Sequence, residues 1–463
     1  MSFNLEEVEF ETVTSKRNVF FWAMYDLANT IYSMVIVSLI ISRYVLVIGQ
    51  LEHGLTYGEA SFIFGSVESI MAAGIAICVP ILGALSDTAG KRKPYVISLT
   101  GIILLFASLI GFFHNIAIVL LFYVIANMAY NFSLTFYDAM LPFIAKKEDI
   151  GKVAGFGVAW GYLGTIISLF ILMPFIFSLG DVNSIPPLLP EDDPVKYGYT
   201  DSWIPFILPM ILFLVFAIPF LFVHEKQKKG GMPSIGKLIK GTFKQLKGTF
   251  KDIKKHRPMF IFIFGYFFIS DIANVIVLYM MQLVTDGLVI GTDGNPSDTF
   301  GIIYIIIATI SAVIFTYFMG KFGERYGGKN TFYLVGALWL TALAIGVILI
   351  FVFPYINIGL NIPFIFSLMI GIIAGPALGG TWTAQRIMVT ELAPKEKFGE
   401  YFGFSKLSGR VSSSIGPLIF GAILLTYDII GKSAYGWALI SGGVVMGIGL
   451  LIISFVDVSG SNK

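Results

Sequence analysis

The chain repeats itself, and each copy carries an aspartate inside a segment that is otherwise apolar. A short stretch around Asp26 returns around Asp271, with an asparagine three residues later in both copies. Residues 140–164 return in the same way as residues 388–412. A membrane chain built from two similar halves is typical of a transporter whose site lies where the halves meet. The aspartates inside these segments indicate where that site is.

The composition predicts an all-α membrane protein. Of 463 residues, 56% are hydrophobic and only 13% are charged, whereas a soluble domain carries about 25% charged residues. The apolar residues form runs of about 20, each long enough to cross a bilayer as a helix. We predict twelve spans in two pseudo-symmetric six-helix halves. They cover residues 18–48, 57–86, 94–114, 116–144, 150–179, 202–223, 258–284, 298–320, 329–353, 361–390, 396–427 and 433–456.

The distribution of lysine and arginine predicts the orientation. If the N-terminus is cytoplasmic, most of the 31 Lys and Arg residues fall in cytoplasmic segments, as the positive-inside rule requires. The N-terminal residues lack the features of a signal peptide, so we expect the first span to serve as its own insertion signal. We expect a multi-pass protein of the prokaryotic plasma membrane, with both termini cytoplasmic, that functions as a monomer.

These spans divide the chain into five parts: a cytoplasmic tail (1–17), an N-terminal half (18–223), a basic linker (224–257), a C-terminal half (258–456) and a cytoplasmic tail (457–463). Apolar residues recur at helical spacing among the lysines of the linker. This pattern predicts an amphipathic helix on the cytoplasmic face of the membrane. The alternative is a plain basic connector between two six-helix halves.

The loop between the second and third spans carries glycines, an acid and a basic cluster. It contains Gly83, Asp87, Gly90 and the basic residues 91–93. A degenerate copy follows the eighth span and consists of Gly320, Glu324, Arg325, Gly327 and Lys329. On twelve spans with a long basic mid-loop, this pattern resembles the signature loop of the major facilitator superfamily.

The two signature loops contain predicted gating residues. An acid there can bind helix N-termini or basic groups, and such contacts would latch the halves in one conformation and release them in the other. We therefore predict gating roles for Asp87, Arg92 and Glu324. The basic residues also fit ordinary positive-inside topology, and both interpretations can hold together.

Within that superfamily the chain resembles the vacuole-effluxer-like group, the prokaryotic relatives of autophagy-linked vacuolar amino-acid exporters. Residues 25–30, 137–142 and 399–404 carry this resemblance. Two departures stand out, because Leu27 replaces a tryptophan of the group and Asp138 replaces an asparagine. The resemblance implies transport, with amino acids as the best-known substrate class.

The repeated aspartates are candidate ion-coupling sites. A charge in the hydrocarbon costs at least about 2.5 kcal/mol, so Asp26 and Asp271 must face a cavity or a partner. A carboxyl group kept from water can take up and release a proton, which suits coupling to protons or sodium. Asn29 and Asn274 share their helix faces and are candidate substrate contacts. The alternative is that both acids bind neighbouring asparagines or helix ends.

Three further charges lie deep in predicted spans. Glu68 follows a stripe of small residues in the second span, and it is either a proton carrier or the ion-pair partner of Lys406 or Arg410. Lys406 and Arg410 lie one helical turn apart in the eleventh span. They would bind the carboxylate of a zwitterionic substrate, whose ammonium group would meet Asp26 or Glu68. The structural alternative is salt bridging among these charges.

A polar stripe on the fourth span predicts a helix that lines a cavity. Asn131 lies in its middle and is a candidate substrate contact, whereas Asp138 lies near its cytoplasmic end. The counterpart of Asp138 in the repeat is Arg386, and this pair would form an inner gate. The alternative is that both side chains snorkel to the interface. In the tenth span, Gly375 and Pro376 predict either a hinge or tight helix packing.

These patterns predict a secondary active transporter of a small polar solute, most simply an amino acid or another zwitterionic or anionic metabolite. Transport would proceed by alternating access with proton coupling. The sequence has no nucleotide-binding loop, metal-ligand cluster or nucleophile triad, so we expect no enzymatic activity and no cofactor. The expected partners are the substrate, protons and the lipid bilayer, and no nucleic acid. The alternatives are a cation-coupled sugar symporter of the glycoside type and a membrane receptor or scaffold that does not transport.

Overall fold

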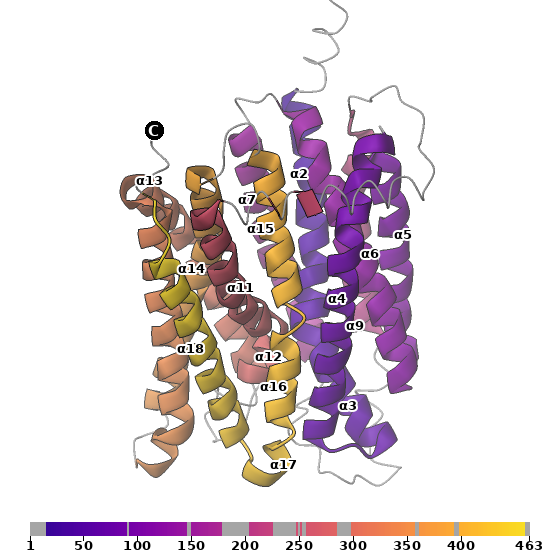
Figure 1. The fold of residues 1–463 in the computed structure, drawn as a ribbon. Helices are drawn as coiled ribbons and strands as arrows, with labels where there is room; N and C mark the ends of the chain where they lie inside the picture. The colour runs from indigo at the N-terminus through magenta and orange to yellow at the C-terminus, as the bar shows by residue number, and fades with distance from the viewer. Residues whose placement is uncertain are drawn as a thin grey trace, which may run out of the picture. The chain divides into compact units, whose positions relative to one another are not determined.

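The computed structural model describes most of the chain as helix (Figure 1). The described residues are 15–89, 92–145, 150–177, 203–225, 247–248, 251, 256–284, 298–356, 361–392 and 398–458. Every regular element in these ranges is a helix. The helix predicted in the linker falls almost entirely outside them.

The helices follow the predicted spans. Those of the first half are α2 (Lys16–Ile31), the π-helical η1 (Tyr32–Ile40), α3 (Ile41–His53), α4 (Tyr57–Ala89), α5 (Lys93–Leu109), η2 (Ile110–Phe112), α6 (Ile116–Ile144), α7 (Ile150–Phe177), α9 (Ile204–Ala217) and η4 (Ile218–Phe222). Those of the second half are α11 (Arg257–Leu278), α12 (Met280–Gln282), α13 (Asp298–Phe351), η6 (Phe353–Tyr355), α14 (Asn361–Leu392), α15 (Phe398–Ser412), α16 (Gly416–Leu424), α17 (Tyr427–Ile430) and α18 (Ser433–Ser454).

The prediction of an all-α membrane protein is confirmed. Eleven stretches of the described chain are helical, long and apolar enough to cross a membrane. The predicted fifth span corresponds to α7. The eighth and ninth spans meet inside α13, where Gly327 has a φ of 84° that a residue without a Cβ adopts freely.

The residue contacts divide the chain into two compact units. Unit 1 contains residues 1–40, 74–179 and 197–245, and unit 2 contains residues 41–73, 180–196 and 246–463. Unit 2 therefore includes α3 and the first part of α4, which the sequence repeat assigns to the first half.

In unit 1, α2 packs closely on α7 through glycines. A Cβ at Gly164 would lie 2.5 Å from the carbonyl oxygen of Leu27, and a Cβ at Gly161 would lie 2.9 Å from the Thr30 hydroxyl. A Cβ at Gly157 would lie 2.9 Å from Oδ2 of Asp26. Only glycines allow the two helices to approach this closely.

In unit 2, the glycines of α14 serve tight packing against α13. A Cβ at Gly375 would clash with the backbone oxygen of Ala308. The helix continues through Pro376, although proline has no N–H for the carbonyl of Ile372. The Ser311 hydroxyl of α13 donates a hydrogen bond to that carbonyl over 2.7 Å. The freed backbone group is thus satisfied inside the bundle, as a membrane requires.

We predict that the Gly375→Ala variant is less stable than the parent by about 1–3 kcal/mol, because the added methyl group meets fixed backbone. The matched control is Gly443→Ala on α18, where a Cβ meets nothing within 4 Å. That change should be neutral or slightly stabilising, because alanine favours a helix over glycine. Thermal unfolding of the detergent-purified proteins measures both effects, and equal midpoints would contradict the packing interpretation.

Candidate functional site

The eleventh span is broken in its middle. Helix α15 ends at Ser412 and α16 begins at Gly416, and a short non-helical stretch joins the two (Figure 1). Pro417 stands in the first turn of α16 and has no N–H of its own to donate. A break at this depth leaves backbone N–H and C=O groups without helical partners, and each needs another hydrogen-bond partner inside the protein.

Side chains of α11 contact both sides of the break. Oδ1 of Asp271 accepts the N–H of Gly416 over 3.0 Å, at the N-terminus of α16. The hydroxyls of Ser270 and Ser412 share a hydrogen bond of 3.0 Å. Asn274 donates from Nδ2 to the carbonyl oxygen of Gly409 over 3.4 Å. Asp271 is only 4% exposed, so its contact with the helix N-terminus is poorly screened.

The repeat partner of Asp271 has a different environment. In unit 1, half-buried Asp26 accepts a long hydrogen bond of 3.5 Å from Nδ2 of Asn29, which is buried. Its carboxylate lies against α7 at Gly157. Helix α7 runs without a break, so it presents no helix N-terminus to this acid.

Two exposed arginines approach one buried tyrosine in unit 2. Arg386 on α14 and Arg410 in the last turn of α15 both act electrostatically on Tyr266 of α11. The side chain of Lys406 lies outside the described residues, although its backbone belongs to α15. This part of unit 2 therefore presents positive charge at an exposed surface, where an anionic group can bind.

A second acid of unit 2 lies near the same broken helix. Glu68 on α4 is buried and acts electrostatically on Tyr279 of α11. The Tyr279 hydroxyl donates to the carbonyl oxygen of Pro417 over 3.4 Å, next to the residue that Asp271 caps. Asp271 thus meets the first turn of α16 directly, and Tyr279, on which Glu68 acts, bonds the same turn.

The first part of α4 packs on α16 and its neighbours, and we call this contact the seam. Gln282 donates from Nε2 to the hydroxyls of Tyr57 and Ser61, over 2.9 Å in each case. The hydroxyls of Tyr57 and Tyr435 form a further hydrogen bond.

The backbones also approach closely along the seam. A Cβ at Gly65 would lie 2.5 Å from the carbonyl oxygen of Pro417, and a Cβ at Gly58 would lie 2.7 Å from that of Leu424. Glycines on α4 therefore bring it against the whole length of α16.

The remaining predicted residues of the membrane interior lie on α6 and α14. Buried Asn131 donates from Nδ2 to the carbonyl oxygen of Asn127 over 2.8 Å. Asp138, near the end of α6, is exposed. Because Asp138 belongs to unit 1 and Arg386 to unit 2, their pairing as an inner gate stays a prediction.

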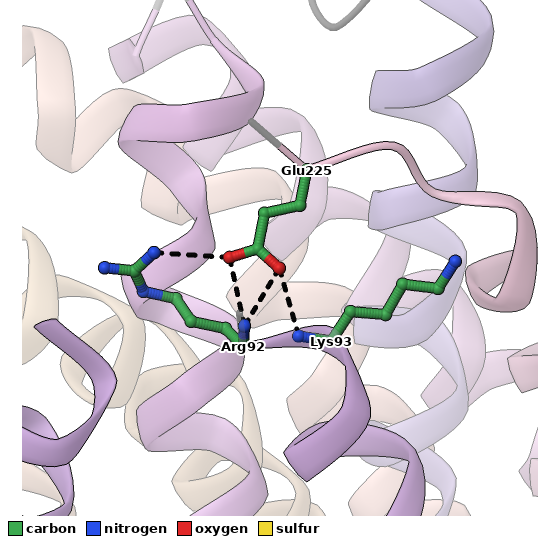
Figure 2. Close-up of polar contacts among 3 residues, drawn as sticks. All are labelled: Arg92, Lys93 and Glu225. Carbon is green, nitrogen blue, oxygen red and sulfur yellow. Dashed lines mark hydrogen bonds and ion pairs between the residues drawn. The ribbon is translucent and has the colours of Figure 1, made fainter. Parts of the chain in front are cut away.

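The signature loop of unit 1 ends in a polar clamp (Figure 2). Glu225, just after η4, forms a 3.2 Å ion pair with Nη1 of Arg92. It also accepts the backbone N–H groups of Arg92 and Lys93, over 2.9 and 3.1 Å. The side chains of Arg92 and Glu225 are only 3% and 1% exposed, so this ion pair is buried.

A lysine side chain caps the C-terminal end of the sixth span, and the second half has an equivalent lysine. Nζ of Lys93 donates to the carbonyl oxygens of Leu221 and Val223, over 2.6 and 3.0 Å. In unit 2, Nζ of Lys329 donates to the carbonyl oxygens of Ser454 and Val456 at the end of α18, over 2.7 and 2.8 Å. Both lysines satisfy carbonyls at a helix C-terminus, where positive charge is favourable.

In unit 2 an acid likewise accepts a backbone N–H of the signature loop, but this acid belongs to a different helix. Glu391, at the end of α14, accepts the N–H of Gly328 over 2.9 Å. Burial raises the pKa of the Glu391 carboxyl above its usual range, and the hydrogen bond from Gly328 opposes that shift. The side chains of Asp87 and Glu324 lie outside the described residues, so their gating roles stay predictions.

Sequence reasoning did not identify several of these contacts. Ser270, Ser412 and Gly416 were not assigned to a break, although serines followed by Gly416-Pro417 are a helix-breaking signal. Glu225 gave no signal at all, because it lies more than 130 residues from the loop that it clamps. Only the fold brings these partners together.

The comparisons with known proteins agree with this architecture. The sequence model of a family described as "Vacuole effluxer Atg22 like" matches residues 51–463. The MFS-type transporter YxiO of Bacillus subtilis (strain 168) is 24% identical over 438 residues, which cover 94% of both chains.

Among solved structures, the nucleoside transporter NupG has a TM-score of 0.67 at 13% identity, covering 95% of this chain and 100% of its own. The D-xylose-proton symporter also has a TM-score of 0.67, at 12% identity, covering 93% and 96%. At these identities the likeness shows the fold alone.

We predict that Glu225→Ala destabilises the protein by about 3 kcal/mol or more, because Arg92 would keep a buried charge without its acid. The matched control is Glu52→Ala, which removes an exposed glutamate from the end of α3 and should change stability by less than about 0.5 kcal/mol. Thermal unfolding in one detergent compares the two, and similar small shifts in both variants would contradict the importance of the clamp.

Proposed function

The chain belongs to the vacuole effluxer Atg22-like family of transporters, and from this premise we propose that it moves an amino acid or another small zwitterionic or anionic metabolite. The family and the fold are those of a multi-pass membrane transporter rather than of an enzyme. Transport proceeds by alternating access, driven by protons.

The observation that best supports this proposal is the charge pattern of unit 2. Arg386 and Arg410 approach the same tyrosine from two helices at an exposed surface, while the acids Glu68 and Asp271 are buried. A guanidinium group binds a carboxylate through two parallel hydrogen bonds, which suits the carboxyl end of an amino acid. Lys406, one turn before Arg410, would add to this positive charge.

The amino end of the substrate needs an acceptor, for which we propose Asp26 or Glu68. Neutral hydrogen bonds to the rest of the substrate would come from Asn29, Asn131 and Asn274. Each asparagine already donates to a neighbouring carbonyl or carboxylate oxygen, which supports a fixed orientation of its amide.

Proton coupling is proposed for the three membrane acids Asp26, Glu68 and Asp271. An acid inside a membrane span is costly to keep charged, and such acids mark proton relays in many transporters. One of the solved structures of similar fold is described as a proton symporter. We further propose that the protein works as a monomer in a prokaryotic plasma membrane, with both termini in the cytoplasm.

A sugar symporter is the second candidate, because the D-xylose-proton symporter shares the fold. The two proposals differ in what they ask of the basic residues. A neutral sugar has no carboxylate, so its binding would not depend on the charges of Lys406 and Arg410.

A ligand screen by thermal stabilisation tests the proposal. The detergent-purified protein is heated with amino acids, dipeptides, organic acids and sugars, at pH 5.5 and 7.5. A ligand at 100 times its Kd should add about 2.7 kcal/mol of stability. We predict a response to at least one amino acid that Lys406→Ala and Arg410→Ala abolish, because these residues bind its carboxylate.

The control for that screen is Lys16→Ala, which removes an exposed positive charge at the start of α2 and should leave the response unchanged. A sugar response that survives both α15 variants would contradict the zwitterion site and favour the sugar symporter.

A further inference from the structure

We propose that Asp271 is a positioning residue whose charge holds α16 in place, so that protonation of Asp271 loosens the seam between α4 and α16. This inference deepens the proposed function and rests on it, since it gives the coupling proton a mechanical consequence. It concerns contacts within unit 2 only.

The two sides of the break depend on different partners. At the end of α15 the freed carbonyls are satisfied locally, because the hydroxyls of Ser413 and Ser414 donate to the carbonyl oxygens of Arg410 and Val411, over 2.8 and 2.6 Å. At the start of α16 the N–H of Gly416 depends on Asp271 of another helix. Helix α11 also contacts the end of α15 through Ser270 and Asn274, but neither of these side chains is ionisable. The attachment of α16 is therefore the contact that a change of charge on α11 can alter.

The charge of Asp271 strengthens that attachment in two ways. A hydrogen bond to a carboxylate is roughly twice as strong as one to a neutral acceptor. A negative charge at a helix N-terminus is further favoured by the helix dipole, most of all where the site is partly buried. A neutral Asp271 loses both contributions, although its oxygen can still accept the bond.

The segment that Asp271 holds is the one that carries the seam. Pro417 of α16 lies against Gly65 of α4, and Leu424 at the other end of α16 lies against Gly58. A loosened α16 therefore weakens the contact along its length. The Ser61 side chain, which is 1% exposed within the seam, would then become accessible.

Other charged and titratable groups face this region and must be separated from Asp271. They are Tyr266 of α11, Tyr279 just after it, Tyr57 and Glu68 of α4, Arg386 of α14, Arg410 of α15, Asp428 of α17 and Tyr435 of α18. Helix α16 contributes no titratable side chain. Glu68 and Asp428 are the carboxyl groups among them, so Glu68→Gln and Asp428→Asn are the matched controls.

Cysteine accessibility tests the proposal in the purified full-length protein. Cys78 is the one native cysteine, and Cys78→Ser removes it. Ser61→Cys on that background then reports the seam through its rate of labelling by N-ethylmaleimide between pH 5 and 8. Rates are divided by those of Glu52→Cys, an exposed position, at the same pH, which cancels the intrinsic pH dependence of the thiol.

We expect the normalised labelling rate to rise by about 5- to 30-fold from pH 8 to pH 5, the factor that corresponds to about 1–2 kcal/mol. With Asp271→Asn, which keeps an accepting oxygen but no charge, the rate should be high and independent of pH. Glu68→Gln and Asp428→Asn should each keep the parent profile. Asp271→Ser, a second neutral capping residue, replaces the asparagine variant if that protein does not fold.

Three results would overturn the proposal: a parent profile that does not change with pH, a neutral variant at position 271 that keeps the parent profile, or loss of the pH dependence in Glu68→Gln or Asp428→Asn. The assay uses no substrate. A failed ligand screen with intact pH-dependent labelling would therefore refute the substrate class and leave the role of Asp271 standing.

Discussion

Backbone polar groups within a membrane must find partners inside the protein, and the broken eleventh span makes this requirement acute. The contact between Asp271 and Gly416 meets it at the start of α16. Helix α16 then carries Pro417 and Leu424 against the glycines of α4. A single carboxylate thus connects the first helix of the second half with α16, the helix that lies against the glycines of α4.

The internal repeat has kept some contacts and changed others. Lys93 and Lys329 still perform the same task, since each closes the C-terminal end of the last helix of its half. The aspartates have diverged, because Asp26 faces the unbroken α7 whereas Asp271 caps a helix. Equivalent positions in a repeat can therefore hold equal residues with unequal functions.

The sequence predicts the helices well because the bilayer imposes a simple rule on length and polarity. Apolar runs of about 20 residues become spans, and the repeated acids fall inside them as expected. Contacts between distant segments were not predictable, and Glu225 shows why. No local pattern distinguishes it from any acid after a helix, and its role arises only when the fold places it beside Arg92.

The broken span lies between these cases. Its serines and Gly416-Pro417 weaken a helix locally, but the apolar run around them predicts one continuous span. The sequence left two interpretations of Asp271 open, an ion-coupling site and a bond to a neighbouring asparagine or helix end, and its spacing on α11 did not decide between them. Whether this acid binds a helix end or exchanges an ion depends on the neighbouring helix, which sequence alone does not place.

Hydrogen–deuterium exchange of the purified protein tests the central claim most directly. The peptide that spans residues 405–424 contains the break, and a peptide from α7 provides the comparison within the same sample. If Asp271 holds α16, Asp271→Ala should speed exchange across the break and leave the α7 peptide unchanged. Unchanged exchange at residues 405–424 in that variant would contradict the claim that Asp271 holds the helix.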